Sequence, residues 1–110
     1  MNARTMSITI LVAVAAILFA CPAYAHKVSV FAYVEGAKVY TESYFSDGQP
    51  VKGGKILVYD SAHKLLLEGV TDEKGLFSFA VPRVDDLSIV LEASMGHRGT
   101  YVLKRSELEN

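Results

Sequence analysis

The chain has 110 residues, a formal net charge of −1 and a single cysteine, which leaves room for one small domain. The near-neutral charge gives no electrostatic footprint for nucleic acid, and no polybasic run indicates an anionic membrane surface. Apolar residues make up 51% of the sequence, but they are concentrated in residues 1–25, and the rest has an ordinary globular composition.

Residues 1–25 are predicted to form a cleavable secretory signal helix. Arg4 supplies the positive start, and residues 8–20, ITILVAVAAILFA, form an uncharged apolar run that is short for a membrane span. Ala23 and Ala25 give the small-x-small pattern that signal peptidase accepts. The cut is therefore expected after Ala25.

Export would place residues 26–110 in the periplasm or on the extracytoplasmic face of the inner membrane. Two alternatives stay open: residues 8–20 could be kept as a membrane anchor, or Cys21 could carry a lipid after LFAC. Cys21 is the one cysteine of the chain and is lost with the signal, so the domain has to fold without a disulfide.

The segment after the signal is predicted to be a single all-β domain, residues 26–110. Apolar and polar residues alternate with a period of two, turns are rich in Gly and Asp, and no convincing period of 3.6 is present. Seven short strands of this kind indicate a two-sheet antiparallel β-sandwich of the prealbumin-like or immunoglobulin-like type. The expected strands are residues 27–34, 38–45, 55–60, 64–70, 76–79, 87–94 and 98–105.

Two finer expectations follow from the same pattern. In the first strand Val28, Val30, Ala32 and Val34 share one face, whereas Phe31 and Tyr33 lie on the other. Because both sets are apolar or aromatic, both faces of this strand are expected to be covered. The last residues, SELEN, are expected to be a frayed tail.

The sequence contains little that would support catalysis, so the protein is predicted not to be an enzyme. No cysteine is left for thiol chemistry after export, and neither a G-x-S-x-G motif nor a phosphate-binding glycine loop is present. The adjacent pair Asp85 and Asp86 is expected to be a solvated turn.

His26 would be the first residue of the exported protein, and processing would change its chemistry. A free amino-terminal histidine offers two nitrogen donors, the α-amine and the imidazole Nδ1, which close a chelate ring on one metal ion. Their reference pKa values are about 8 and about 6.5, so a competing metal can displace both protons at neutral pH. Such donors suit nickel, cobalt, copper or zinc and do not suit magnesium or calcium. The alternative is that a histidine stands first by chance.

Two nitrogen atoms rarely complete a metal site, and His97 in the turn SMGHRG is the better candidate for a second histidine ligand. This assignment requires the first and last strands to lie close together at one end of the sandwich. Met95 could add a weak thioether ligand, which suits copper(I) better than nickel. Glu42 could bind the metal or orient an imidazole, and His63 in the turn SAHK is a weaker candidate. The alternative for His97, Glu42 and His63 is an ordinary exposed polar side chain.

Three blocks of the sequence together resemble the small extracytoplasmic accessory component of nickel/cobalt energy-coupling-factor (ECF-type) uptake transporters. The resemblance covers nearly the whole of residues 26–110 and implies an exported protein that works beside a membrane substrate-binding subunit and a cytoplasmic ATPase pair. It carries the amino-terminal histidine of that family onto His26 and the histidine of its Met-Gly-His turn onto His97. A longer stretch, GKILVYDSAHKLLLEGVTDEKGLFSF, is similar to prealbumin-like or carboxypeptidase-regulatory-like sandwiches. The three blocks are AHKVSVFAYVEGAKVYTESYFSDGQPVKGGKILVYD, GLFSF and LEASMGHRGTYVL.

These observations predict a transport accessory protein that captures Ni²⁺ or Co²⁺ and presents it to the membrane permease. The protein would be membrane-associated through that partner, and nucleic acid is not expected to bind. Two alternatives stay open: a periplasmic copper-binding protein or copper oxidase that uses the same amino-terminal histidine and binds Cu²⁺, or a metal-free adhesion or spacer module.

Overall fold

The computed structural model describes residues 27–109, so the predicted signal helix and His26 lie outside the described part of the chain. A 3-10 turn, Ser94–Gly96, precedes the last strand, and a short helix, α2 (Arg105–Leu108), follows it. The strands are β1 (Val28–Glu35), β2 (Lys38–Phe45), β3 (Lys55–Tyr59), β4 (Leu65–Val70), β5 (Leu76–Ala80), β6 (Leu87–Glu92) and β7 (Arg98–Leu103).

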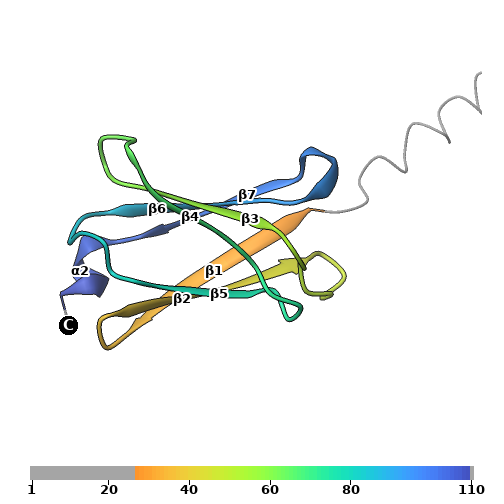
Figure 1. Cartoon of the computed structure of the whole chain (residues 1–110), viewed down its shortest axis with the longest axis horizontal. Helices are drawn as coiled ribbons and strands as arrows, with labels where there is room; N and C mark the ends of the chain where they lie inside the picture. Colours follow the sequence, from red (N-terminus) through yellow and green to blue (C-terminus); the bar gives the residue numbers. More distant parts are fainter. Residues whose placement is uncertain (1–26, 110) are drawn as a thin grey trace, which may run out of the picture.

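The seven strands form two antiparallel sheets that pack face to face (Figure 1). One sheet has three strands in the order β1-β2-β5, and the other has four in the order β4-β3-β6-β7. The prediction of an all-β, seven-stranded antiparallel sandwich is confirmed, and each predicted strand is found within a few residues of its expected ends.

The core lies between the sheets and is built from alternate residues of the strands. On β1 the buried residues are Val28, Val30 and Ala32, which fits the predicted inward face. Burying a Val, Leu or Ile side chain contributes about 1.5–3 kcal/mol, so this layer is the main source of stability in a domain without a disulfide. The other residues of the buried apolar cluster are Val39, Val51, Ile56, Val58, Phe79, Leu87, Ile89, Leu91 and Leu103.

The expectation that both faces of the first strand are covered is wrong. Phe31 is 48% exposed and Tyr33 is 39% exposed, because residues 27–109 place no third layer over the three-stranded sheet. Their rings pack against neighbouring aromatic rings instead: Tyr33 stacks on Tyr40 at 5.4 Å, and Phe31 meets Tyr101 edge to face at 5.5 Å. Such lateral pairs stabilise a sheet without a covering layer.

The carboxyl-terminal segment differs from the expected frayed tail. It turns into α2, where the carboxylate of Glu107 accepts a hydrogen bond from the Lys104 N–H at 3.2 Å. The Arg105 N–H donates to Asp86 at 2.8 Å, and Leu108 packs against the core. A capping carboxylate and one apolar contact therefore hold the segment.

Within the described part of the chain, no helix has the length and hydrophobicity needed to cross a bilayer.

Candidate metal centre

The start of β1 and the start of β7 lie at the same end of the sandwich, as the strand trace shows (Figure 1). Gly99 near the start of β7 approaches Val28 at the start of β1 so closely that a Cβ on the glycine would be 2.9 Å from the Val28 carbonyl oxygen. The turn before β7, which carries His97, is therefore adjacent to the first described residues. The sequence-based requirement that first and last strands meet at one end is fulfilled.

The loop after β2 also reaches this end. The Ser46 N–H donates to the carbonyl oxygen of Lys27 at 3.0 Å, which ties the residue before β1 to the loop. Within the loop, the Gly48 N–H donates to Phe45 at 2.9 Å and the Gln49 N–H donates to the Asp47 carboxylate at 3.0 Å. These bonds fix the loop backbone and hold Asp47 at the edge of the same surface.

His97 closes the turn between β6 and β7. Its carbonyl accepts a hydrogen bond from the Ala93 N–H at 2.8 Å, and its own N–H donates to Ser94 at 3.4 Å. Between them, Met95 adopts a left-handed backbone with φ of 62°, which is uncommon for a side chain other than glycine. Met95 is 92% exposed, whereas His97 is half-buried. The turn thus presents a thioether outward and keeps the imidazole closer to the body of the domain.

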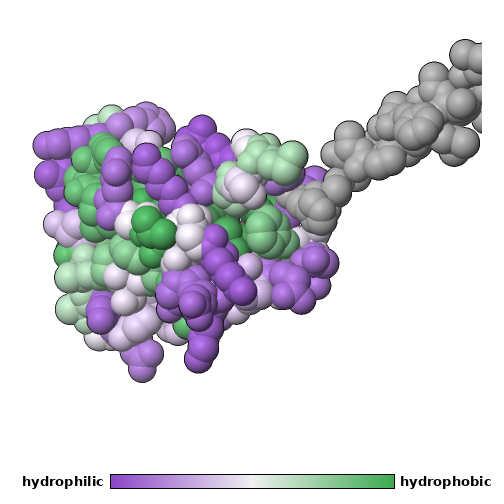
Figure 2. All heavy atoms as spheres, turned by 45° about the vertical axis from the view of Figure 1, so that its right-hand side comes forward, coloured by the Kyte–Doolittle hydropathy of each residue, from purple (hydrophilic) through white to green (hydrophobic). Residues whose placement is uncertain are grey.

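The side chains of this end surround a hollow of about 210 Å³. Figure 2, which brings this side forward, shows apolar groups set among hydrophilic ones. A carboxylate, an imidazole and a thioether line one hollow, a mixed set of donors that suits first-row transition metals. The lining residues are Phe45, Asp47, Ser94, Met95 and His97.

Asp47 is a member of this set that sequence reasoning missed. In the sequence it stands in SDGQP, where aspartate before glycine is the expected composition of a turn. Its place beside His97 depends on the contact between two loops that are far apart in the chain. The signal that could have found it is its position in the YTESYFSDG block, next to a predicted ligand-bearing end.

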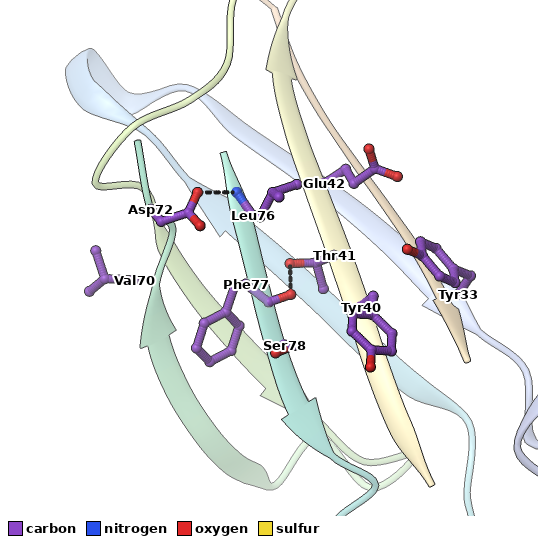
Figure 3. A pocket seen from close by; sticks show the side chains of 9 residues that line it. All are labelled: Tyr33, Tyr40, Thr41, Glu42, Val70, Asp72, Leu76, Phe77 and Ser78. Atoms are coloured by element: carbon purple, nitrogen blue, oxygen red, sulfur yellow. Dashed lines mark hydrogen bonds between the residues drawn. The ribbon is translucent and has the colours of Figure 1, made fainter. Parts of the chain in front are cut away.

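The structure does not bring Glu42 to His97. Glu42 lies on the outer side of β2 and lines a different hollow of about 540 Å³, together with Tyr33 and Tyr40 (Figure 3). Its carboxylate accepts a hydrogen bond from the Tyr44 hydroxyl at 2.9 Å, and this bond raises the pKa of Tyr44 above its usual value. Glu42 is therefore placed to orient a tyrosine rather than an imidazole.

His63 lies at the other end of the four-stranded sheet. β3 and β6 pair so that Lys55 faces Glu92 near the His97 turn and Tyr59 faces Ser88 at the opposite end, just before His63. His63 has a φ of 62° in the turn between β3 and β4. It is thus separated from His97 by the length of the sheet and belongs to another surface.

Within residues 27–109, no group of three or more His, Cys, Asp or Glu side chains is placed to hold a metal ion. At the end where β1 starts, the described chain supplies one imidazole, that of His97, and the Asp47 and Glu92 carboxylates each share a hollow with it. A complete nitrogen-rich site therefore needs donors from outside this range, and the predicted ligand His26 precedes Lys27 directly in the sequence.

The described residues thus define a small β-sandwich with a half-buried histidine at the end where its first strand starts. No protein-family model matches the chain. A curated protein of Haemophilus influenzae (strain Rd), described as an uncharacterized protein, is 34% identical to it over 91 residues. The match covers 80% of this chain and 56% of that protein, so the chain spans just over half the length of the curated relative. The function is accordingly inferred from the site.

Proposed function

We propose that this protein is an extracytoplasmic accessory component of a nickel/cobalt uptake transporter. In this role it captures Ni²⁺ or Co²⁺ as cargo and presents the ion to a membrane permease of the ECF type. The proposal is supported by one structural observation above all: His97 lies at the end of the sandwich where β1 starts, and β1 starts two residues after His26 in the sequence.

Covalent geometry makes the pairing of the two histidines feasible. The carbonyl of Lys27 is held by the Ser46 N–H at 3.0 Å, and consecutive Cα atoms are about 3.8 Å apart, so the residue before Lys27 is bonded to a fixed point. That point is next to the loop of Asp47, which shares a hollow with His97. We therefore expect an amino-terminal histidine attached there to reach both groups.

In the proposed site His26 binds through its α-amine and Nδ1, and His97 adds a third nitrogen. Asp47 can contribute a carboxylate oxygen or accept a hydrogen bond from an imidazole N–H, which fixes the orientation of the ring. Three nitrogen donors favour nickel or cobalt over magnesium and calcium. The formation of the chelate ring requires the free amine, so capture of the ion depends on removal of the signal.

An accessory protein of this kind has to release its ion, and the surface around His97 is suited to transfer. Met95, which lines the hollow, is 92% exposed. A partner can approach ligands on such a surface without unfolding the domain. A closed four-ligand site in the core would instead hold the ion for structural purposes.

Met95 also supports the copper-binding alternative. Its thioether lines the same hollow as His97, and thioether sulfur prefers Cu(I) over the harder ions Ni²⁺ and Co²⁺. In that case Met95 would be a ligand and its removal would weaken copper binding, whereas nickel binding by nitrogen atoms would be little affected.

Isothermal titration calorimetry on the exported protein tests the proposal, after mass spectrometry has established that its first residue is His26. Saturable binding of Ni²⁺ or Co²⁺ with one ion per chain is the expected result. Binding of copper alone, weakened by Met95→Leu, would favour the copper alternative. Heat from none of the three metals would leave a metal-free spacer module as the function and overturn the proposal.

A further inference from the structure

A second surface, on the outer face of the four-stranded sheet, has a distinct chemistry. A trough of about 390 Å³ crosses this face from the turn between β3 and β4 to β7. It shares no lining residue with the hollow of Asp47 and Met95, although Arg98 follows His97 directly in the chain, and His63 lies at one of its ends. The residues that line it are Tyr59, His63, Ser88, Val90, Arg98 and Thr100.

Strand register explains why these side chains share one face. Tyr59 is paired with Ser88 across β3 and β6, and Val90 is paired with Thr100 across β6 and β7. Paired residues point to the same side of an antiparallel sheet, and alternate residues along a strand do so too. Val90 is 5% exposed although it points away from the core, so it forms the apolar floor of the trough.

Five hydrogen-bond donors surround that floor. Tyr59, Ser88 and Thr100 carry hydroxyl groups, His63 carries an imidazole and Arg98 carries a guanidinium. Within residues 27–109, none of these five side chains makes a hydrogen bond or an ion pair with another residue. The donors therefore remain available for a ligand.

The trough also has a favourable electrostatic balance for an anion. No carboxylate is among its lining residues. Glu92 faces Arg98 across the β6–β7 ladder, but the ion pairs of the described chain do not include Arg98. Among the described residues the Arg98 guanidinium therefore forms no ion pair that a phosphate would have to break.

We propose that this trough is a binding site for a phosphate group. Arginine binds two oxygen atoms of a phosphate at once, and hydroxyl and imidazole N–H groups donate to the others. The group can belong to free phosphate or to the head group of an anionic phospholipid. This activity is additional to metal capture and does not depend on His26 or His97.

A titration of the ¹⁵N-labelled exported protein with sodium phosphate, followed by NMR at constant ionic strength, tests the site. Phosphate is expected to shift the amide signals of Tyr59, Ser88, Arg98 and Thr100 in a saturable manner. Sodium chloride at the same ionic strength is expected to leave them in place. Equal shifts with chloride, or shifts that cluster elsewhere, would overturn the proposal.

Two matched variants distinguish phosphate binding at a specific site from attraction by the net charge of the protein. Arg98→Gln should weaken phosphate binding by at least about five-fold, because a charged hydrogen-bond donor is lost. Arg105→Gln changes the net charge by the same amount on α2, outside the trough, and should leave the affinity unchanged. Equal phosphate affinity of R98Q and the parent protein would contradict the proposed site.

Thr100→Val serves as a second variant because it removes one donor without altering the charge or much of the volume. It should weaken binding by a few-fold while the rest of the spectrum stays as in the parent protein. An unchanged affinity for both T100V and R98Q would contradict the site even if phosphate bound somewhere on the protein.

Vesicles distinguish the two sources of the phosphate group. Co-sedimentation with phosphatidylglycerol vesicles but not with phosphatidylcholine vesicles, lost in R98Q, would assign the trough to lipid head groups. Saturable binding of inorganic phosphate without vesicle binding would assign it to a soluble phosphate. Binding of neither probe would refute the proposal.

Discussion

The carbonyl of Val28 lies directly against the backbone of Gly99. A Cβ at residue 99 would be 2.9 Å from that oxygen atom, which is closer than real Cβ atoms come. This contact joins the start of β1 to the start of β7, two strands that belong to different sheets. The glycine therefore sets the distance between the start of β1 and the turn of His97.

Gly99→Ala should force these two strands apart. The overpacking is expected to lower the free energy of unfolding by about 1–3 kcal/mol, measured by urea denaturation. It should also weaken Ni²⁺ binding if the site spans the junction. Thr100, at the next position, is exposed, so Thr100→Ala should change the free energy of unfolding by no more than about 0.5 kcal/mol. Equal stability of G99A and T100A would contradict the importance of the contact.

The proposed metal site can be tested through the α-amine of His26. One alanine added before His26 abolishes the chelate ring, and His97→Ala removes the imidazole of the turn, so each change should weaken Ni²⁺ binding at least about 10-fold in calorimetry. His63→Ala removes a histidine at the opposite end of the sheet and should leave the affinity as it is. A loss of affinity in H63A, with no effect of the extension, would show that the ligands lie elsewhere.

Thr71 ties together the loop before β3 and the end of β4. It is 4% exposed, and its hydroxyl donates to the Val51 carbonyl at 2.6 Å and accepts from the Gly54 N–H at 2.8 Å. Thr71→Val should lower the free energy of unfolding by about 2–3 kcal/mol, because two buried backbone groups lose their partner. Thr71→Ser keeps the hydroxyl and should retain most of the stability in the same urea assay.

Ser43 offers the opposite case. Its hydroxyl is fully buried and has no hydrogen-bond partner among the described residues. Ser43→Ala is expected to leave the protein as stable as before or to stabilise it by up to about 1 kcal/mol, since an unsatisfied polar group is removed. Thr41→Val provides the comparison: this hydroxyl donates to Phe77 at 3.1 Å, and its loss should destabilise the protein. A melting temperature that drops in S43A would show that the hydroxyl has a partner in solution.

Asp85 should make stability depend on pH in the acid range. The N–H and the hydroxyl of Ser61 donate to its carboxylate at 3.1 Å and 2.8 Å, and these bonds hold the pKa of Asp85 below its usual value. A lowered pKa in the folded state means that the carboxylate stabilises the fold above the unfolded pKa of about 3.9. This contribution is lost as the pH falls through the folded pKa.

Urea denaturation between pH 6 and pH 2.5 checks this expectation. Asp85→Asn should be less stable than the parent protein at pH 6, and the two should converge as the pH falls below about 4. Ser61→Ala removes the hydroxyl donor and should reduce the same pH dependence. A difference between D85N and the parent that stays constant across the range would contradict the assignment.

Much of the fold could be predicted from alternation alone. The pattern of Val28, Val30 and Ala32 identified the inward face of β1 because a strand places alternate side chains on opposite sides. The same pattern could not show that Phe31 and Tyr33 are exposed. Whether a second face is covered depends on how many layers the domain has, and a strand on its own carries no information about that.

The candidate site was harder to predict from the sequence than the fold, because it depends on which strands lie side by side. The position of His97 relative to the first strand followed only from the close approach of β1 and β7, which belong to different sheets. Glu42, His63 and Asp47 are each plausible in the sequence, and the register of the strands decides which of them can act together. Local sequence indicates the type of a side chain, whereas its neighbours come from contacts between distant segments.

The bond between Ser46 and Lys27 has a consequence for the order of events during export. If the leader is cut after Ala25, only His26 lies between the cleaved peptide bond and Lys27. The folded sandwich holds the carbonyl of Lys27 through the Ser46 N–H. A peptidase needs an accessible, extended segment on both sides of the bond that it cleaves. If the predicted leader is cleaved, we therefore expect cleavage before this end of the domain closes, and a mutant that folds first should keep its leader and a blocked amine.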